Sequence, residues 1–345
     1  MTEKKKKISL IGRIIFFFNS VFAALLLLSY ILPYAVPKSF PILSVLSLLV
    51  PVFIVINFCF MLFWILNVRK HFLLSLFVLI LGYSHVTSLY KFSGNTSEPS
   101  KNAISMMSYN VRLFNIYDWI KEEHIDKKIV DLVRSESPDI IAFQEFHSNQ
   151  EAAFSFYPYK YVVLKGKNQK IGQAIFSKFP IIHQGSVEFP NTPNNAIYID
   201  ILQQKDTIRV YNLHLESLRI NPQKEEFSQK NSERLLKRMG NTFKMQQSQV
   251  ELFEINRKNC KYKKIILGDF NNTQFSNVYK TIKGDMKDAF VKAGKGFGRT
   301  LDFSYFPMRI DFILVDKSFT VQNFQTFSEH YSDHYAIKSV ISVGN

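Results

Sequence analysis

The chain has few cysteines, and its first 90 residues have almost no acidic side chains. Two cysteines, Cys59 and Cys260, cannot form a disulfide framework or a cysteine-based zinc site, so we expect two unpaired thiols. Residues 1–90 carry one acid, Glu3, against eight basic residues, a net charge of +7 that leaves +8 of the chain's +15 for the remainder. This split predicts a membrane module over residues 1–90, followed by a polar globular domain.

Three long apolar stretches lack any Lys, Arg, Asp or Glu; they are residues 14–32, 42–66 and 72–90. A helix needs roughly 20 apolar residues to cross a bilayer, so each stretch predicts a transmembrane helix. The first stretch is too long for the apolar part of a signal peptide, and no small-residue cleavage site precedes the next stretch. The sequence therefore predicts a multi-pass module that binds the lipid bilayer through three helices.

The basic residues that flank these stretches predict the orientation of the module. The run Lys4–Lys7 and the pair Arg69 and Lys70 lie on one side of the membrane if there are three spans. Positively charged flanks stay in the cytoplasm, so everything after Tyr90 is expected outside it. In a bacterium this means the cytoplasmic (inner) membrane, with a periplasmic catalytic domain. Two spans, or an interfacial third segment, would instead leave that domain in the cytoplasm.

Residues 91–103 are rich in Ser, Asn and Gly and predict a polar linker. From residue 104 to 345 short β-rich runs alternate with longer amphipathic ones. The pattern indicates a helix over 121–135 and one or two surface helices over 222–257. Strands are predicted at 104–114, 138–146, 159–165, 173–178, 196–203, 206–216, 264–270, 309–315 and 334–343. Because strands outnumber helices, a layered α/β sandwich fits better than a regular βαβ repeat.

Polar and ionisable side chains end or interrupt many of these apolar runs. They are Asn110, Glu145, His214, Asp269, Asn271, Asp311, Asp333 and His334. An Asp at one strand end is ordinary, but α/β scaffolds hold their reactive groups at the strand ends. Several carboxylates, two histidines and two amides in equivalent positions therefore predict an active site.

This set of side chains suits phosphoryl hydrolysis. Carboxylate oxygens of Glu145 and Asp333 are suitable ligands for a hard cation such as Mg²⁺, Mn²⁺ or Ca²⁺. Such a metal would stabilise charge on the phosphoryl oxygens while a carboxylate activates water. The two histidines, His214 and His334, can donate hydrogen bonds to the negative charge of the transition state.

The strings SYNVR, IIAFQE, NLHLES, GDFNN, RIDFILV and SDHYAI resemble the motifs of the endonuclease/exonuclease/phosphatase superfamily. That superfamily includes deoxyribonuclease I-type nucleases, abasic-site endonucleases, sphingomyelinases and inositol-polyphosphate phosphatases. The resemblance runs in the family's order from about Ser105 to Val343. It implies a four-layer α/β sandwich of two mixed sheets flanked by helices.

The resemblance also implies a role for each residue. For the metal, it implies contacts from Asn110 and Glu145, with Asp333 completing the metal site or its surroundings. Nuclease branches that attack DNA often have a small or acidic residue at the position of Arg112. That arginine could contact a phosphate or pair with a nearby acid.

For the chemistry, the resemblance implies that Asp269 orients the attacking water and that Asn271 beside it binds phosphate or metal. It further implies that His214 and His334 contact the scissile phosphate, and that Asp311 holds His334 in the right tautomer. The histidine at 214, where the abasic-site branch has a different string, favours the branch of DNase I-type nucleases, sphingomyelinases and phosphatases.

These observations predict a membrane-anchored, divalent-metal-dependent phosphoesterase, with nuclease-like phosphodiester hydrolysis as the leading function. A phospholipid phosphodiesterase and an inositol-phosphate phosphatase are the enzymatic alternatives, since the basic charge suits any polyanion. A membrane protein that uses the fold only for binding is a remote alternative. The sequence indicates no protein partner.

Overall fold

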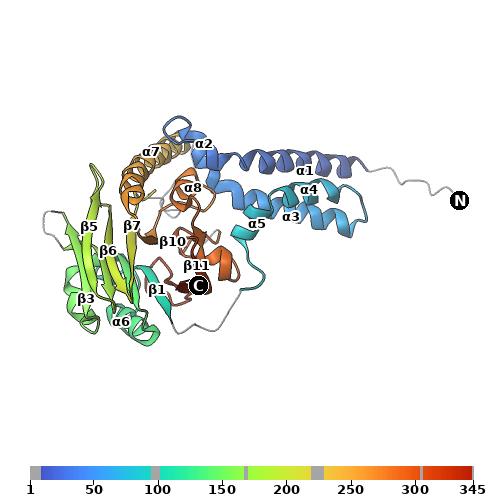
Figure 1. Cartoon of the computed structure of the whole chain (residues 1–345). Helices are drawn as coiled ribbons and strands as arrows, with labels where there is room; N and C mark the ends of the chain where they lie inside the picture. The colour runs from blue at the N-terminus through green and yellow to red at the C-terminus, as the bar shows by residue number, and fades with distance from the viewer. Residues whose placement is uncertain (1–8, 95–101, 167–169, 219–228, 304–305, 344–345) are drawn as a thin grey trace.

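The structure, a computed structural model, describes residues 9–94, 102–166, 170–218, 229–303 and 306–343. A bundle of apolar helices over residues 10–89 lies beside a domain of two β-sheets (Figure 1). Residues 95–101 of the predicted linker lie outside the described part of the chain.

Each sheet has six strands. The first is ordered β11 (Phe319–Thr326), β12 (Ile337–Val343), β1 (Ala103–Asn110), β2 (Ile140–His147), β4 (Ile171–Ser177), β3 (Tyr159–Lys165). The second is ordered β5 (Ile181–Glu188), β6 (Asn195–Gln203), β7 (Asp206–His214), β8 (Lys263–Asp269), β10 (Asp311–Val315), β9 (Lys287–Asp288). Strands β1 and β2 are parallel, as are β7 and β8, and the other paired neighbours are antiparallel. Both sheets are therefore mixed, as predicted.

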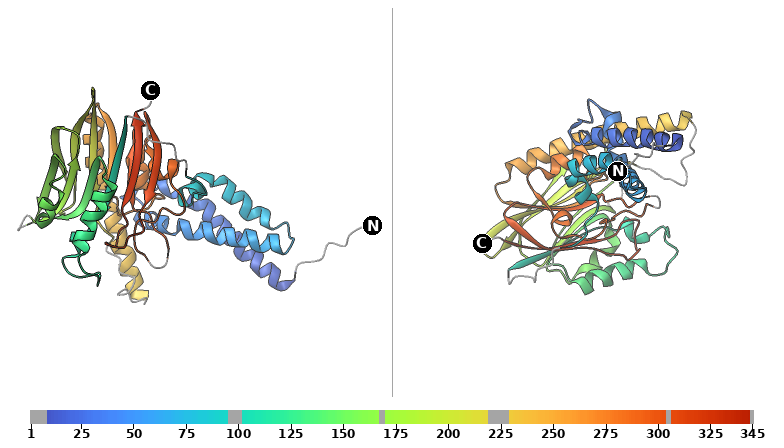
Figure 2. Two further views of the ribbon diagram at one scale, coloured as in Figure 1. Left: turned by 90° about the horizontal axis from the view of Figure 1, so that it is seen from below. Right: turned by 90° about the vertical axis from the view of Figure 1, so that its right-hand side faces the viewer.

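The two sheets pack face to face over one apolar core. Met106 and Ile140 of the first sheet share this core with Ile199, Val210 and Ile265 of the second, and all five are fully buried. Helices cover the outer faces, with α6 over the first sheet and α7 and α8 over the second (Figure 2). Burial on both faces explains why the central strands are continuous apolar runs, and it confirms the predicted α/β sandwich.

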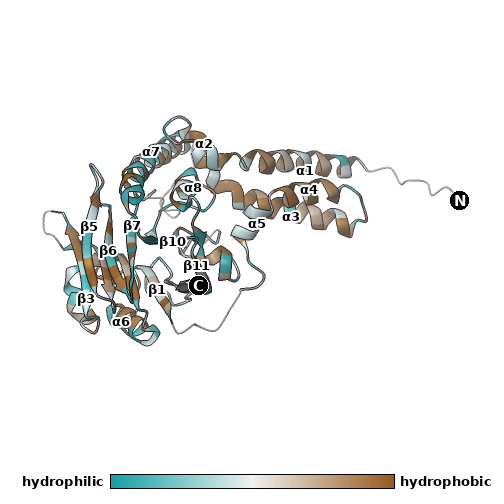
Figure 3. Cartoon of the chain, viewed as in Figure 1, coloured by the Kyte–Doolittle hydropathy of each residue, from teal (hydrophilic) through white to brown (hydrophobic). Residues whose placement is uncertain are grey.

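The helices of the sheet domain are more polar than those of the bundle (Figure 3). They are η3 (Arg112–Asn115), α6 (Ile125–Glu136), η4 (Ser148–Phe154), α7 (Gln229–Asn259), α8 (Asn277–Lys283) and α9 (Ala289–Ala293). Thus the first predicted helix begins at Ile125 rather than 121. The second is one helix from 229, and residues 222–228 of its predicted range lie outside the described residues.

Three strands escaped the sequence analysis, β5, β9 and β11. All three are edge strands, and in β5 the sequence IIHQGSVE leaves His183 and Gln184 exposed. An edge strand buries less of its surface, so its apolar pattern is weaker. The first predicted strand is also too long, because the chain leaves the sheet after Asn110. Cys59 and Cys260 are unpaired, as expected.

The N-terminal bundle differs from the three predicted spans. Its helices are α1 (Leu10–Ser29), η1 (Leu32–Tyr34), α2 (Pro41–Leu46), η2 (Ser47–Leu49), α3 (Val50–Leu66), α4 (Phe72–Leu81) and α5 (Tyr83–Leu89). Two helical segments, residues 10–34 and 41–66, are long and apolar enough to cross a membrane. The prediction of a third continuous span over 72–90 is wrong, because α4 and α5 meet at an angle of 81°. If this bent pair is counted as one span, the bundle has three spans.

The bend at Gly82 has a local cause. The ring of Tyr30 occupies the space that a side chain at position 82 would need, and its hydroxyl donates to the carbonyl of Val78 at 2.9 Å. Glycine alone leaves room for that ring. The residues that follow include Ser84, His85 and Thr87, so α5 is less apolar than α4.

Buried polar side chains tie three helices of the bundle together. Asn19 of α1 donates from Nδ2 to Ser75 Oγ of α4 at 2.6 Å and accepts from Trp64 Nε1 of α3 at 2.9 Å. Ser75 in turn donates to Asn57 Oδ1 at 3.2 Å. In an apolar environment such groups must be paired with one another, so this network specifies how the helices pack.

Candidate active site

The sheet topology brings the predicted polar residues from distant parts of the sequence to one place. The parallel pair β1 and β2 sets Asn110 beside Gln144, and the parallel pair β7 and β8 sets His214 beside Asp269. The antiparallel neighbour β10 adds Asp311, which is paired with Asp269. These strand ends meet between the two sheets, as expected for an α/β active site.

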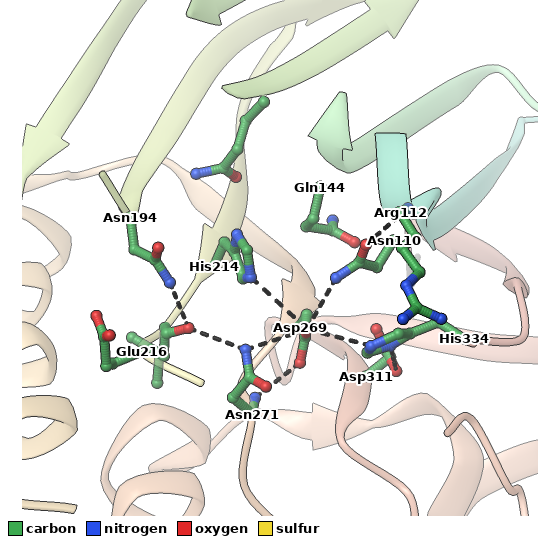
Figure 4. Close-up of polar contacts among 12 residues, drawn as sticks. Asn110, Arg112, Gln144, Asn194, His214, Glu216, Asp269, Asn271, Asp311 and His334 are labelled. Carbon is green, nitrogen blue, oxygen red and sulfur yellow. Dashed lines mark hydrogen bonds and ion pairs between the residues drawn. The ribbon is translucent and has the colours of Figure 1, made fainter. Parts of the chain in front are cut away.

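Asp269 lies at the centre of the polar contacts (Figure 4). Its side chain is 1% exposed, and it accepts hydrogen bonds from Asn110 Nδ2 at 3.1 Å and from the backbone N–H of Asn271 at 2.7 Å. Nε2 of His214 and Nε2 of His334 lie 3.8 and 3.7 Å from its Oδ2. The carboxylate is therefore fixed in position between two imidazole rings.

The surroundings of Asp269 alter its acidity. Burial raises the pKa of its carboxyl to about 6, with His334 opposing and Asp311 adding to the rise. Such a group is ionised at neutral pH yet takes up a proton far more readily than an exposed aspartate. A pKa close to the working pH is what a general base requires.

The pKa values of the two histidines are shifted in opposite directions. Although burial alone would lower it, the carboxylates of Asp311 and Asp269 raise the pKa of His334 well above its usual value. Burial lowers the pKa of His214, with Asp269 opposing. These shifts favour the protonated form of His334 and the neutral form of His214, and groups whose pKa values are pushed apart in this way mark acid and base roles.

Glu145 reaches the site through an irregularity in its strand. The pairing of β2 with β4 shifts register between Phe143 and Phe146, and Glu145 has a φ of 50°. A bulge of this kind re-aims one side chain, here toward the cavity that Asp269 and His334 also line. Burial raises the pKa of Glu145, His334 opposes the rise, and Asp333 adds to it.

Arg112 and Asp333 form an ion pair at the edge of this cluster, with Nη1 and Oδ2 3.2 Å apart. Of the two roles left open for Arg112 by the sequence, the structure shows pairing with an acid. Arg112 begins four consecutive residues with positive φ, ending at Asn115, an unusual left-handed turn for residues other than glycine. This turn follows β1 directly and carries the guanidinium to Asp333.

Three supporting residues were missed by the sequence analysis. Gln144 donates from Nε2 to Asn212 Oδ1 at 2.6 Å and so joins the two sheets beneath the site. Thr300 accepts at Oγ1 from the backbone N–H of Asp311 at 3.1 Å. Gln144 and Asn212 stand beside predicted residues in the strings FQE and NLH, which was a usable signal. Thr300 has no such signal, because its partner lies eleven residues away in the chain.

All eight predicted residues thus lie in or beside one cluster, although the structure tests none of the roles assigned to them. Asn271 donates from Nδ2 to the carbonyl of Leu215 at 2.9 Å and to Asp269 Oδ2 at 3.2 Å. Asn110 accepts at Oδ1 from the backbone N–H of Arg112 at 3.1 Å. Both amides therefore orient Asp269 and the neighbouring backbone, and their contact with metal or phosphate stays a prediction.

The donor set fits a hard divalent cation. One potential ligand atom from each of Asp269, Asp311 and His334 lies within 4.8 Å of the others. Oδ1 of Asp311 is buried and has no hydrogen-bond partner in the described part of the chain. Glu145 and Asp333 line the same cavity. A phosphate ester is an anion, and it can approach so many carboxylates only if a cation is bound between them. Oxygen donors are the ligands that Mg²⁺ or Mn²⁺ prefers.

Two mixed sheets flanked by helices, with reactive side chains where strands from both sheets end, define a phosphoesterase-like α/β sandwich. Comparison of the sequence with protein families confirms this class. Residues 107–334, about two-thirds of the chain, match the Endonuclease/Exonuclease/phosphatase family, so the chain belongs to that family. Residues 12–89 match a domain of unknown function. No curated protein sequence matches the chain.

Solved structures share the fold of the sheet domain. An endonuclease/exonuclease/phosphatase family protein from Bacteroides thetaiotaomicron is 20% identical, with a TM-score of 0.53, over 71% of this chain and 98% of that one. The human nocturnin catalytic domain with bound sulfate is 16% identical, with a TM-score of 0.55, over 74% and 97%. A mannosyl-6-phosphatase from Bacteroides thetaiotaomicron is 20% identical, with a TM-score of 0.51, over 69% and 99%. At these identities the likeness establishes the fold alone.

Proposed function

We propose that this protein is a divalent-metal-dependent phosphoester hydrolase held at a membrane by its N-terminal helices. One observation carries the proposal, namely the placement of the Asp269 carboxylate between the imidazole rings of His334 and His214, whose pKa values are shifted in opposite directions. The family contains both nucleases and phosphatases, as its name states, so membership supports the reaction type and leaves the substrate open. The relatives do not decide it either, since one is a mannosyl-6-phosphatase.

In the proposed reaction a water molecule attacks phosphorus while its proton passes to the carboxylate of Asp269. The bond between phosphorus and the leaving oxygen breaks, and the leaving oxygen takes up a proton from a second water molecule of the solvent. His334 donates a hydrogen bond from Nε2 to the phosphoryl oxygens, where negative charge accumulates. Asp311 holds the opposite nitrogen of that ring, because Nδ1 of His334 lies 2.9 Å from Asp311 Oδ2.

The metal has a limited place in this proposal. Glu145 and Asp333, which line the same cavity as Asp269, are the side chains that would hold it. When bound, a divalent cation supplies charge stabilisation to the phosphoryl oxygens. Asn110 keeps the Asp269 carboxylate in place through its hydrogen bond.

Membrane attachment and orientation are part of the same proposal. The sheet domain lies at the end of the bundle where α1 ends and α3 begins, while α1 begins at the far end (Figure 1). The basic residues Arg69 and Lys70 lie between α3 and α4, at that far end as well. This arrangement supports a cytoplasmic N-terminus and an extracytoplasmic catalytic domain in the inner membrane of a bacterium.

The test of the proposed reaction is a substrate panel. The full chain, purified in detergent with Mg²⁺ or Mn²⁺, is incubated with DNA, RNA, phospholipid, inositol phosphates and simple p-nitrophenyl phosphate esters. We expect metal-dependent hydrolysis of at least one class. Failure to hydrolyse any phosphate ester with either metal would favour the binding-protein alternative.

A further inference from the structure

The candidate active site lies at the bottom of a cavity of about 440 Å³ whose walls come from two parts of the chain. The sheet domain contributes all of the polar lining residues, Glu145, Asp269 and His334 among them, together with apolar ones such as Leu301 and Met308. The rest of the lining comes from the N-terminal bundle. Its lining residues are apolar without exception, and they are Leu48, Leu49, Pro51, Val52 and Leu89.

This apolar wall is a fixed part of the cavity, because the bundle packs tightly on the sheet domain around it. Leu32, Val50 and Leu89 of the bundle form one cluster with Phe275 of the sheet domain, and Phe306 packs against it. The wall is therefore held by the same contacts that join the two parts of the molecule.

Further contacts between the bundle and the sheet domain lie near α7 and α8. Val45 of α2 is buried with Leu218 and Phe243, and the backbone N–H of Lys38 donates to Gln247 Oε1 at 2.7 Å. Asn277 of α8 donates from Nδ2 to the carbonyl of Pro33 at 2.9 Å. The wall thus rests on contacts from several elements of both parts.

Two residues of the wall keep much of their surface exposed. Leu49 is 42% and Val52 is 36% exposed, although they border a cavity that also contains carboxylates. Leu49 ends η2 and Val52 lies in the first turn of α3, the helix proposed to cross the bilayer, so the cavity lies at the level where the membrane surface would be. An open apolar wall in that position suits a hydrocarbon chain.

We propose that the substrate is a bilayer lipid carrying a phosphate ester, whose headgroup reaches Asp269 and His334 while its hydrocarbon chain lies along Leu49 and Val52. This inference rests on the proposed hydrolase function and names its substrate class. Apposition to the membrane would also keep the enzyme at a high local concentration of that substrate.

The lining of the cavity favours lipid over nucleic acid. Among its described residues the only Lys or Arg is Arg309, whose Nη1 is ion-paired with Asp288 Oδ2 at 2.7 Å. Nucleic-acid binding depends on several basic side chains in contact with successive phosphates, and the described wall opposite the site offers leucine and valine instead.

The experiment compares two diesters with the same leaving group, ethyl and octyl p-nitrophenyl phosphate. With the full chain in one non-ionic detergent, we expect the octyl ester to have at least about a tenfold higher kcat/KM. Each fully buried methylene could raise kcat/KM roughly fourfold, so a tenfold gain from the longer chain is a modest expectation. Octylphosphonate, which cannot be hydrolysed, should raise the melting temperature more than ethylphosphonate does.

Variants of the wall test whether the chain lies where we infer. Val52→Trp fills the cavity and should bring the octyl-to-ethyl ratio close to one. Val55→Trp is the matched control, since Val55 is on the same helix, is 39% exposed and does not line the cavity. A second pair is Leu49→Ala with Leu43→Ala as its control. Leu49→Ala should lower the octyl-to-ethyl ratio and Leu43→Ala should not, because Leu43 is 44% exposed and does not line the cavity.

The possible results separate the two proposals. If wild-type protein hydrolyses both diesters at equal kcat/KM, the lipid inference fails while the hydrolase function stands. The inference would also fail if Val52→Trp and Val55→Trp reduced the octyl-to-ethyl ratio equally. The preference for the octyl ester would then come from the detergent micelle and not from the cavity wall. Faster cleavage of DNA than of the octyl ester would point to nucleic acid. If no ester is hydrolysed, the proposed function itself fails.

Discussion

Asp311 and His334 form a buried carboxylate–imidazole pair, with Oδ2 and Nδ1 2.9 Å apart and both side chains less than 10% exposed. Strand β10 contributes the carboxylate, and the loop before β12 contributes the imidazole. The backbone of Asp311 is itself held by Thr300 Oγ1. The pair fixes the ring so that its Nε2 points toward Asp269.

Replacing Asp311 by Asn should change the pH dependence of turnover as well as its size. The carboxylate raises the pKa of His334, and the imidazolium form is the one proposed to act. Activity is therefore lost as pH rises through that pKa, and in Asp311→Asn the alkaline limb of the pH–kcat profile should move to lower pH. A uniform decrease in kcat with an unmoved limb would contradict this role.

Substitution of the central residues should affect turnover far more than binding. Asp269→Ala removes the proposed proton acceptor and His334→Ala removes the donor to the phosphoryl group, so each should lower kcat by at least ~10²-fold. The Kd of a non-hydrolysable phosphonate should change much less. Lys237→Ala, on the exposed face of α7, is the control. Wild-type turnover in both variants would refute the hydrolase assignment.

Removal of divalent metal should abolish activity, and Mg²⁺ or Mn²⁺ should restore it. Glu145→Gln keeps the size of the side chain but removes a charge that would hold the ion. We expect this variant to need at least ~10-fold more Mg²⁺ for half-maximal activity, a loss on the scale seen when the support of a metal site is weakened. Full activity of the wild type in EDTA would exclude the metal-dependent mechanism.

The orientation of the chain can be read from reporter fusions in a bacterial host. A reporter that works only outside the cytoplasm should be active when fused after Asn345 and inactive when fused after Asn67, between α3 and α4. The basic flanks at both Lys4–Lys7 and Arg69 favour this arrangement. Inactive reporters at both positions would place the catalytic domain in the cytoplasm and would mean that the bent α4–α5 pair does not cross, whereas the opposite pattern would invert the orientation of the whole chain.

The polar network inside the bundle should contribute to its stability. Asn19→Ala leaves Trp64 Nε1 and Ser75 Oγ without their partner, which should lower the free energy of unfolding by about 1 kcal/mol. SDS titration of the purified chain would measure the loss. Asn67→Ala is a suitable control, since that exposed side chain bonds only to the carbonyl of Phe63 in its own helix. Equal stability of the two variants would argue against a structural role for the network.

Much of the catalytic domain could be predicted from the sequence. Central strands such as β2 and β8 are recognisable because both their faces are buried, which makes them continuous apolar runs. The end of such a run is also the end of the strand, so Asp269 and His214 could be assigned to the site from their positions alone. The edge strand β5 could not be predicted, because much of it faces solvent and its apolar pattern is lost.

The sequence by itself determined the α/β sandwich of mixed sheets and singled out the polar residues that the structure gathers in one cluster, since these depend on local hydrophobicity and on short motifs. Only the tertiary structure decided the pairing of Arg112 with Asp333, the bend at Gly82 and the apolar wall that Leu49 and Val52 place opposite Asp269. Each of these joins residues far apart in the chain. Such contacts arise from the packing of whole elements against one another, and no local pattern encodes them.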